Sequence, residues 1–81
     1  SMALYPNITS SQTVLAFNNL TAQVCELSVI AVNGTVAINR QLQTVAGINQ
    51  HRVDVSSLAK GIYLVMLNSG TDRLVQKLIV E

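Results

Sequence analysis

Side chains that could do chemistry are few in this 81-residue sequence, and they stand apart from one another. The one cysteine, Cys25, and the one histidine, His51, would be the first choice of nucleophile and base for covalent catalysis. Neither residue lies at a strand-to-helix turn or within a polar cluster, where an activated cysteine would be expected. We therefore interpret Cys25 as a small buried hydrophobe and His51 as a solvent-facing strand residue.

The sequence also contains few residues that could form a metal site or an acid–base site. A structural zinc site needs four ligands, and one cysteine with one histidine cannot provide them. The acidic residues are scattered without local pairing, and no glycine-rich phosphate loop is present. The acidic residues are Glu26, Asp54, Asp72 and Glu81. The sequence therefore predicts a domain that is not an enzyme and that carries no cofactor or metal.

The composition excludes several kinds of partner. Charged residues make up 11% of the chain and the net charge is +1, so there is no basic surface for nucleic acid. No polybasic run marks a membrane surface, and no apolar run approaches the roughly 18 residues that a membrane-spanning helix needs. A hydrophobic content of 49% is too high for a disordered tail. We expect a folded domain without a nucleic-acid partner or a transmembrane segment.

The length predicts one domain with a modest core. We assign residues 4–81 to this domain and interpret residues 1–3 as a remnant of cloning. Their sequence, Ser-Met-Ala, has neither the charged region nor the apolar region of a signal peptide. The chain is then either cytosolic or part of a protein whose export signal lies elsewhere.

Short runs of alternating apolar and polar residues, separated by turn signals, predict an all-β fold. The pattern is typical of a two-sheet antiparallel β-sandwich with Greek-key, immunoglobulin-like topology. Six strands are expected, or seven if Tyr5 pairs with a neighbour, and residues 7–12, 43–47 and 69–72 are expected to form turns or loops. The six strands are expected at residues 13–18, 22–32, 35–42, 48–55, 62–68 and 73–80.

Two local signals position parts of this sandwich. Asn33 and Gly34, between two strand patterns, predict a type I′ hairpin turn because both residues tolerate positive φ angles. Leu58, Gly61 and Tyr63 stand at the spacing of a tyrosine corner, in which a tyrosine opening a strand bonds back to the backbone just upstream. Gly61 would supply a backbone angle that a Cβ penalises, Leu58 would close the end of the core, and Tyr63 would use its hydroxyl within the corner.

Alternation also separates the two faces of each strand, with one exception. Residues 62–67 are apolar throughout and residues 78–80 nearly so, whereas a half-exposed strand should alternate. The pattern fits either a central strand that is covered on both sides or, because a two-layer sandwich has nothing to cover its outer faces, exposed apolar surface that contacts a partner or a second copy. The residues assigned to the inner face are Leu15, Phe17, Val53 and Val55, and Leu27 and Val29 are expected to share one face of their strand.

Sequence landmarks that are individually weak fall in a fixed order along the chain. They are Tyr-Pro-Asn at residues 5–7, the Asn33-Gly34 turn, the corner at residues 58–65 and Lys-Leu-Ile-Val at residues 77–80. Together with the length, this order resembles the type A C-terminal sorting domain of the type IX (Por) secretion system of Gram-negative bacteria. The resemblance covers residues 5–81. The chain departs from the family pattern at Ile8, where proline is usual, and at Ile30 and Ala31, where an aromatic residue and an aspartate are frequent.

The resemblance implies a secretion signal at the C-terminus of a larger exported cargo protein. A signal peptide at the far end of the precursor would take it to the periplasm, where the outer-membrane translocon would recognise the sorting domain. A sortase-like cysteine protease would then remove the domain, leaving the cargo at the cell surface or secreted. The residues that the resemblance assigns to recognition are Lys77, Leu78, Ile79, Val80 and Glu81.

The closing strand has few charges for a strand at a sheet edge. Lys77 is the only positive charge in the last five residues, whereas exposed edges usually carry more charge to prevent unwanted pairing. We interpret this strand as an uncapped apolar edge that either packs or is bound. Strand augmentation, in which a receptor adds its own strand to the edge, is one way to bind it.

Two other classes of function stay open. A fibronectin- or immunoglobulin-like accessory or adhesion module of a secreted enzyme would share the tyrosine corner. The chain has no tryptophan to stack on sugar rings, and it is shorter than the roughly one hundred residues of such domains. A small homodimer through the apolar strand faces, with Ile62, Leu64 and Met66 on the contact, is compatible with either function.

Overall fold

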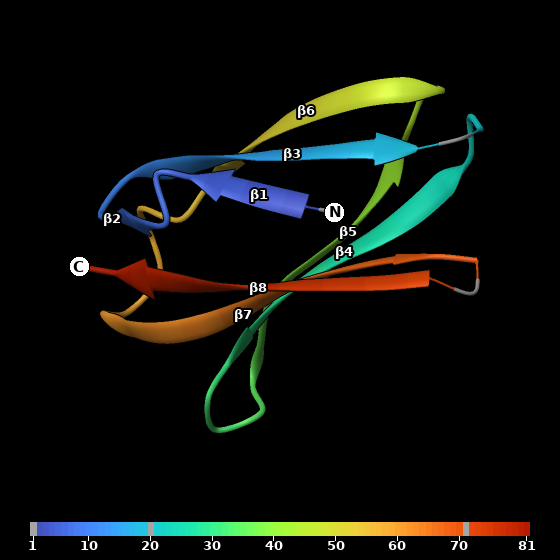
Figure 1. Ribbon diagram of the computed structural model, residues 1–81. Coiled ribbons are helices and arrows are strands. Elements are labelled where there is room, and N and C mark those ends of the chain that lie inside the picture. The colour runs from blue at the N-terminus through green and yellow to red at the C-terminus, as the bar shows by residue number, and fades with distance from the viewer. Residues whose placement is uncertain (1, 20, 71) are drawn as a thin grey trace.

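The computed structural model describes residues 2–19, 21–70 and 72–81, and the described chain is all-β (Figure 1). Eight strands form two sheets, and no helix occurs among the described residues. The predicted β-sandwich class is confirmed. The strands are β1 (Met2–Tyr5), β2 (Ile8–Thr9), β3 (Gln12–Asn19), β4 (Val24–Ala31), β5 (Val36–Gln43), β6 (Gly47–Asp54), β7 (Gly61–Ser69) and β8 (Asp72–Val80).

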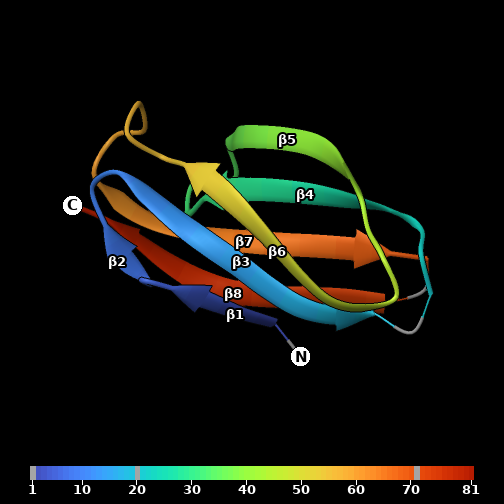
Figure 2. The same cartoon turned by 90° about the horizontal axis from the view of Figure 1, so that it is seen from above.

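The two sheets pack face to face. One sheet has the order β1-β3-β6, and the other has the order β2-β8-β7-β4-β5. Figure 2 shows the strands of the smaller sheet crossing over those of the larger one. Neighbouring strands pair antiparallel, except that β2 runs parallel to β8. Among the described strands the chain changes sheet at every connection except those from β4 to β5 and from β7 to β8, so sequence neighbours contribute to both layers of the core.

The alternation seen in the sequence fills the space between the sheets. The four residues assigned to the inner face are buried, and so are the two that were expected to share a face of the fourth strand; none of the six is more than 3% exposed. Burying an aliphatic or aromatic side chain of this size stabilises a fold by about 1.5–3 kcal/mol relative to leaving it in water. The strand periodicity therefore identifies the main source of stability. These residues are Leu15, Phe17, Leu27, Val29, Val53 and Val55.

The N-terminal segment contains more structure than predicted. Tyr5 pairs with Val14, which makes β1 a full member of the smaller sheet. Residues 7–12 were expected to form a turn, but Ile8 and Thr9 within them form β2 and pair with β8. A two-residue strand is too short to show alternation, and its partner lies at the other end of the chain. Local sequence patterns therefore could not reveal it.

Residues 1–3 were interpreted as a remnant of cloning. Met2 and Ala3 nevertheless belong to β1, where they pair with Phe17 and Ala16 of β3. The Met2 side chain is buried with the core, and its carbonyl accepts a hydrogen bond from Gln76 Nε2 at 2.9 Å. The origin of these residues stays a prediction, but the sandwich uses them.

The hairpin between β4 and β5 forms, but its turn is not of type I′. Gly34 has a φ angle of +91°, whereas no described residue other than glycine has a positive φ. The Gly34 amide donates to the Ala31 carbonyl at 2.9 Å, and the Ala31 amide donates to the Thr35 carbonyl at 2.8 Å. The loop therefore has three residues with glycine last. Asn33 stabilises it by accepting the Thr35 amide on Oδ1 at 3.0 Å, without a left-handed backbone of its own.

His51 does not face solvent as predicted. It is half-buried on the inner side of β6, and its ring stacks on Phe17 with centroids 5.9 Å apart and planes at 17°. His51 is two residues from Val53, so the two side chains lie on the same, inner face of the strand. The prediction was wrong because it followed the polarity of the side chain and not the strand period. Its Nε2 atom is buried and has no hydrogen-bond partner in the described structure.

Two predicted loops are shorter than expected. The ends of residues 43–47 and of residues 69–72 belong to the flanking strands, and Thr71 lies outside the described residues. In the first loop, Thr44 is buried and its hydroxyl donates to the Gln23 carbonyl at 2.9 Å. This polar anchor joins the loop to the segment that leads into β4.

Candidate recognition surface

The last strand, β8, divides its final residues between the core and the surface. Leu78 and Val80 are buried between the sheets and anchor the strand. Lys77 and Ile79 alternate with them and lie on the outer face of the larger sheet, and Glu81 is exposed just beyond the strand. Lys77, Ile79 and Glu81 are therefore available to a partner, whereas Leu78 and Val80 are not.

The end of β8 is not the open edge that we inferred from the sequence. On one side β7 pairs with β8 along its whole length. On the other side β2 pairs with Ile79 and Val80, the Ile79 amide donates to the Asn7 carbonyl at 2.9 Å, and the Glu81 amide donates to the Thr9 carbonyl at 2.9 Å. A receptor cannot add a strand at this position without displacing β2. The motif can instead be bound through its outward-facing side chains.

The strand register surrounds the displayed part of β8 with apolar side chains. Directly paired residues project to the same face of a sheet. On the outer face Ile79 is therefore flanked by Ile8 of β2 and Ile62 of β7. Lys77 is paired with Leu64 of β7 in the same way.

The apolar surface continues from β7 to the edge of the sheet. Leu64 pairs with Ile30 of β4, and Ile30 pairs with Val36 of β5 after a shift in register at Val29 and Ile30. This shift turns Val36 outward, where it is 54% exposed. We call the resulting surface the apolar band. It consists of Ile8, Ile30, Val36, Ile62, Leu64 and Ile79.

The opposite end of the same outer face is polar. Ser28 of β4 accepts a hydrogen bond from Asn39 Nδ2 at 3.0 Å. Asn68 of β7 accepts one from Arg73 Nε at 3.0 Å, and Asn68 also pairs with Glu26 of β4. Polar groups at this end therefore bond with one another, while Val75 and Val24 add exposed apolar side chains to the same face outside the apolar band.

A tyrosine corner holds the beginning of β7 beneath the apolar band. Tyr63 is buried, and its hydroxyl donates to the Ala59 carbonyl at 2.6 Å. Gly61 has a φ angle of +155°, which residues with a Cβ rarely adopt. Leu58 packs against the core, and its amide donates to the Val55 carbonyl at 3.0 Å. The geometry is that of the predicted corner, and it orients the strand that carries Ile62 and Leu64.

One carboxylate near the corner has a shifted pKa. Asp54 Oδ1 accepts the Ser56 amide at 2.9 Å. This backbone hydrogen bond, and then a hydrogen bond with the Ser56 side chain, lower the pKa of Asp54 from its ordinary value of 3.8. The ionised carboxylate therefore stabilises the turn that leads into the corner.

Cys25 and His51 do not form a nucleophile–base pair. Cys25 is buried in β4 of the larger sheet, whereas His51 lies in β6 of the smaller sheet and stacks on Phe17. The nearest polar contact of the Cys25 sulfur is Asn19 Nδ2 at 3.9 Å. Within residues 2–19, 21–70 and 72–81, no three histidine, cysteine or acidic side chains gather as metal ligands.

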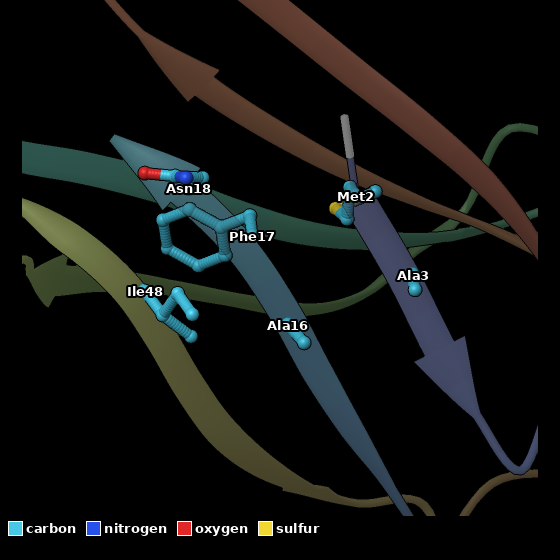
Figure 3. Close-up of a pocket in the computed structure, with 6 residues that line it drawn as sticks. All are labelled: Met2, Ala3, Ala16, Phe17, Asn18 and Ile48. Carbon is cyan, nitrogen blue, oxygen red and sulfur yellow. The ribbon is translucent and has the colours of Figure 1, made fainter. Parts of the chain in front are cut away.

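Neither of two hollows formed by the described residues is lined by an acid–base pair. The first has a volume of about 250 Å³ and lies on the smaller sheet, where two alanines leave space beside Phe17 and Ile48 (Figure 3). The second has a volume of about 490 Å³ and is lined by amide and hydroxyl side chains, with Asp72 as its carboxylate. The first hollow is lined by Met2, Ala3, Ala16, Phe17, Asn18 and Ile48.

Comparison with known proteins identifies the family. The described segments contain no helix that could cross a membrane. The search of curated proteins gave no match. Residues 3–81 match the family described as the secretion system C-terminal sorting domain, and the match covers nearly the whole sandwich. The chain therefore belongs to the family of C-terminal sorting domains of the type IX secretion system.

Proposed function

We propose that this domain is the export address of a larger cargo protein that precedes it in the precursor. In the proposed route the precursor passes through the periplasm, and the type IX translocon of the outer membrane recognises the domain. The cargo then reaches the cell surface or the medium, and a sortase-like cysteine protease removes the domain. The family match over residues 3–81 is the observation that carries this proposal.

The geometry supports an address that is read from a folded surface. Leu78 and Val80 fix β8 in the core, while Lys77, Ile79 and Glu81 are displayed beside them. A partner can therefore contact the motif without unfolding the sandwich. The backbone of the motif is already paired on both sides, so specificity must come from the displayed side chains.

The test is a fusion of residues 2–81 behind a periplasmic reporter enzyme, expressed in a bacterium with a type IX system. The reporter is expected in the medium or on the surface, whereas the reporter without the domain is expected to stay in the periplasm. Lys77→Ala should reduce export, and Arg73→Ala, on the same strand but at the polar end, should not. Periplasmic retention of the wild-type fusion would contradict the proposal.

Removal of the domain is tested on the same exported fusion. The mass of the released reporter should lack most of residues 2–81, and deletion of the sortase-like protease should restore the full mass. Export of a fusion that keeps its full mass in the wild-type bacterium would contradict the cleavage step alone. The address function would stand in that case, because export itself would have been observed.

A further inference from the structure

We infer that the apolar band, together with Lys77, is a docking surface for a protein of the secretion apparatus. The contacting surface of that partner is apolar and carries a carboxylate opposite Lys77. This inference rests on the proposed export function and adds to it residues from β2, β4, β5 and β7 that the terminal motif does not contain. It therefore predicts that the address is a sheet face rather than the last five residues.

The first support is exposure. The smaller sheet covers only one face of the larger sheet, and the opposite face is open (Figure 1). Ile8, Ile62 and Leu64 are 49%, 45% and 42% exposed there. With Val36, which is 54% exposed, these side chains form exposed apolar surface of the kind that marks interaction sites on monomeric proteins.

The second support is the position of Lys77. It lies beside Leu64 at one side of the apolar band, while Arg73 and Glu26 lie at the polar end of the face. A surface that covered the band would also cover the stem of Lys77, so its ammonium group would need a carboxylate or water. A partner with a carboxylate at this point gains electrostatic complementarity, which favours specificity and fast association.

Charge argues against a second copy of this chain as the occupant. The apolar band contains no carboxylate, so two bands packed together would leave Lys77 without a partner of opposite charge. Such packing would also place each Lys77 against the aliphatic residues of the other band. A partner that extends past the band onto β2 and Glu81 can bury more area and leaves Lys77 paired.

The experiment compares matched substitutions in the export fusion of residues 2–81. Ile62→Lys places a charge in the apolar band, and Ile48→Lys places the same charge on the smaller sheet, where Ile48 is 74% exposed. We expect Ile62→Lys to lower export at least tenfold and Ile48→Lys to leave it within twofold of wild type. Lys77→Glu should also lower export, and Lys60→Glu, in the corner loop, should not.

Folding is measured separately, because a lysine in a strand could destabilise the domain. Urea midpoints of the purified domains are compared, and Ile62→Thr is a second variant that keeps β-branching while removing apolar surface. Loss of export by a variant with a wild-type midpoint supports the docking surface. Wild-type export by both Ile62 variants would overturn it while leaving the sorting function intact, and retention of the wild-type fusion would overturn both.

The oligomeric state shows whether a partner protein or a second copy of this chain occupies the apolar band. Light scattering on the purified domain at micromolar concentration should show a monomer for wild type and for Ile62→Lys. A wild-type dimer that becomes monomeric in Ile62→Lys would identify a second copy as the occupant. That result would overturn the partner proposed here.

Discussion

Tyr5 and Tyr63 show how the surroundings of a hydroxyl decide what a side chain contributes. Tyr63 is buried, and its hydroxyl donates to the Ala59 carbonyl at 2.6 Å. Tyr5 is 45% exposed, and its hydroxyl accepts a hydrogen bond from Gln50 Nε2 at 3.0 Å. Water can replace the partner of Tyr5, but the carbonyl in the corner would lose its donor.

Tyr63→Phe is therefore expected to lower the free energy of unfolding by about 1–2 kcal/mol, the cost of losing the hydrogen bond that joins this buried side chain to the corner backbone. Tyr5→Phe is the matched control and should change it by less than about 0.5 kcal/mol, as surface substitutions usually do. Urea denaturation of the three proteins measures both differences. Equal losses of unfolding free energy in the two variants would show that the Tyr63 hydrogen bond contributes no more to stability than the exposed Tyr5 hydrogen bond.

Asp54 makes stability depend on pH. Its pKa is lowered in the folded state by the Ser56 hydrogen bonds, so its contribution is fully present above the unfolded-state pKa, near 3.8. The contribution is lost as the pH falls through the lower, folded-state pKa. Asp54→Ala should be less stable than wild type at pH 7, and the difference should shrink below about pH 4. A difference that is constant from pH 7 to pH 2.5 would contradict this.

The burial of single residues was predicted correctly where the prediction rested on the strand period, and wrongly where it rested on the polarity of the side chain. Alternation correctly buried Leu15, Phe17 and Val53. The same alternation placed His51 inside, but its polarity suggested solvent, and stacking on Phe17 decided the outcome. The displayed positions of Lys77 and Ile79 depend on which face of β8 is covered, which no local pattern specifies.

At the scale of elements, buried polar side chains join chain segments that strand pairing does not connect. Thr44 is 1% exposed. Its hydroxyl donates to the Gln23 carbonyl at 2.9 Å and accepts from the Gln23 amide at 3.2 Å and from Asn19 Nδ2 at 2.8 Å. One side chain therefore joins the end of β3, the start of β4 and the connection to β6.

Thr44→Val keeps the shape of this side chain and removes its hydroxyl. We expect a loss of about 1–3 kcal/mol in the free energy of unfolding, because the half-buried Gln23 amide and Asn19 side chain lose their acceptor. Thr35→Val, in the exposed hairpin loop, is the control and should be close to neutral. Thermal or urea denaturation measures both changes. A neutral Thr44→Val would mean that water can enter and replace the hydroxyl.

Strand positions could be predicted because each long strand has one face in the core. β2 could not, since a two-residue strand has no period and is defined only by its pairing with β8. The turn at Asn33 and Gly34 was placed correctly but assigned the wrong type, because the sequence pair allows more than one hairpin loop. Exposed apolar surface on β7 was predicted, but its extension to Ile8 and Val36 required the register.

At the scale of the whole molecule, the proposed recognition motif and the core share one strand. Removing residues 77–81 takes Leu78 and Val80 out of the core, and each such side chain contributes about 1.5–3 kcal/mol. The total is comparable with the roughly 5–15 kcal/mol that stabilises a typical small domain. A chain ending at Gln76 is therefore expected to be unfolded, with a flat urea curve and rapid proteolysis.

Lys77→Ala and Ile79→Ser are the appropriate comparison, because they change the displayed side chains and leave Leu78 and Val80 in place. Both should keep a cooperative urea transition. A truncated domain with wild-type stability would contradict the packing described for β8. It would also make simple truncation a valid test of the sorting motif.

The parallel pairing of β2 with β8 also sets the order of events during synthesis. Ile8 and Thr9 are made early, but their partners Ile79 and Val80 are made last. At about 5–20 residues per second, the ribosome leaves the first strands without their final neighbour for several seconds. The sandwich closes only when residue 80 is available, so any protein segment translated ahead of the domain has a head start in folding.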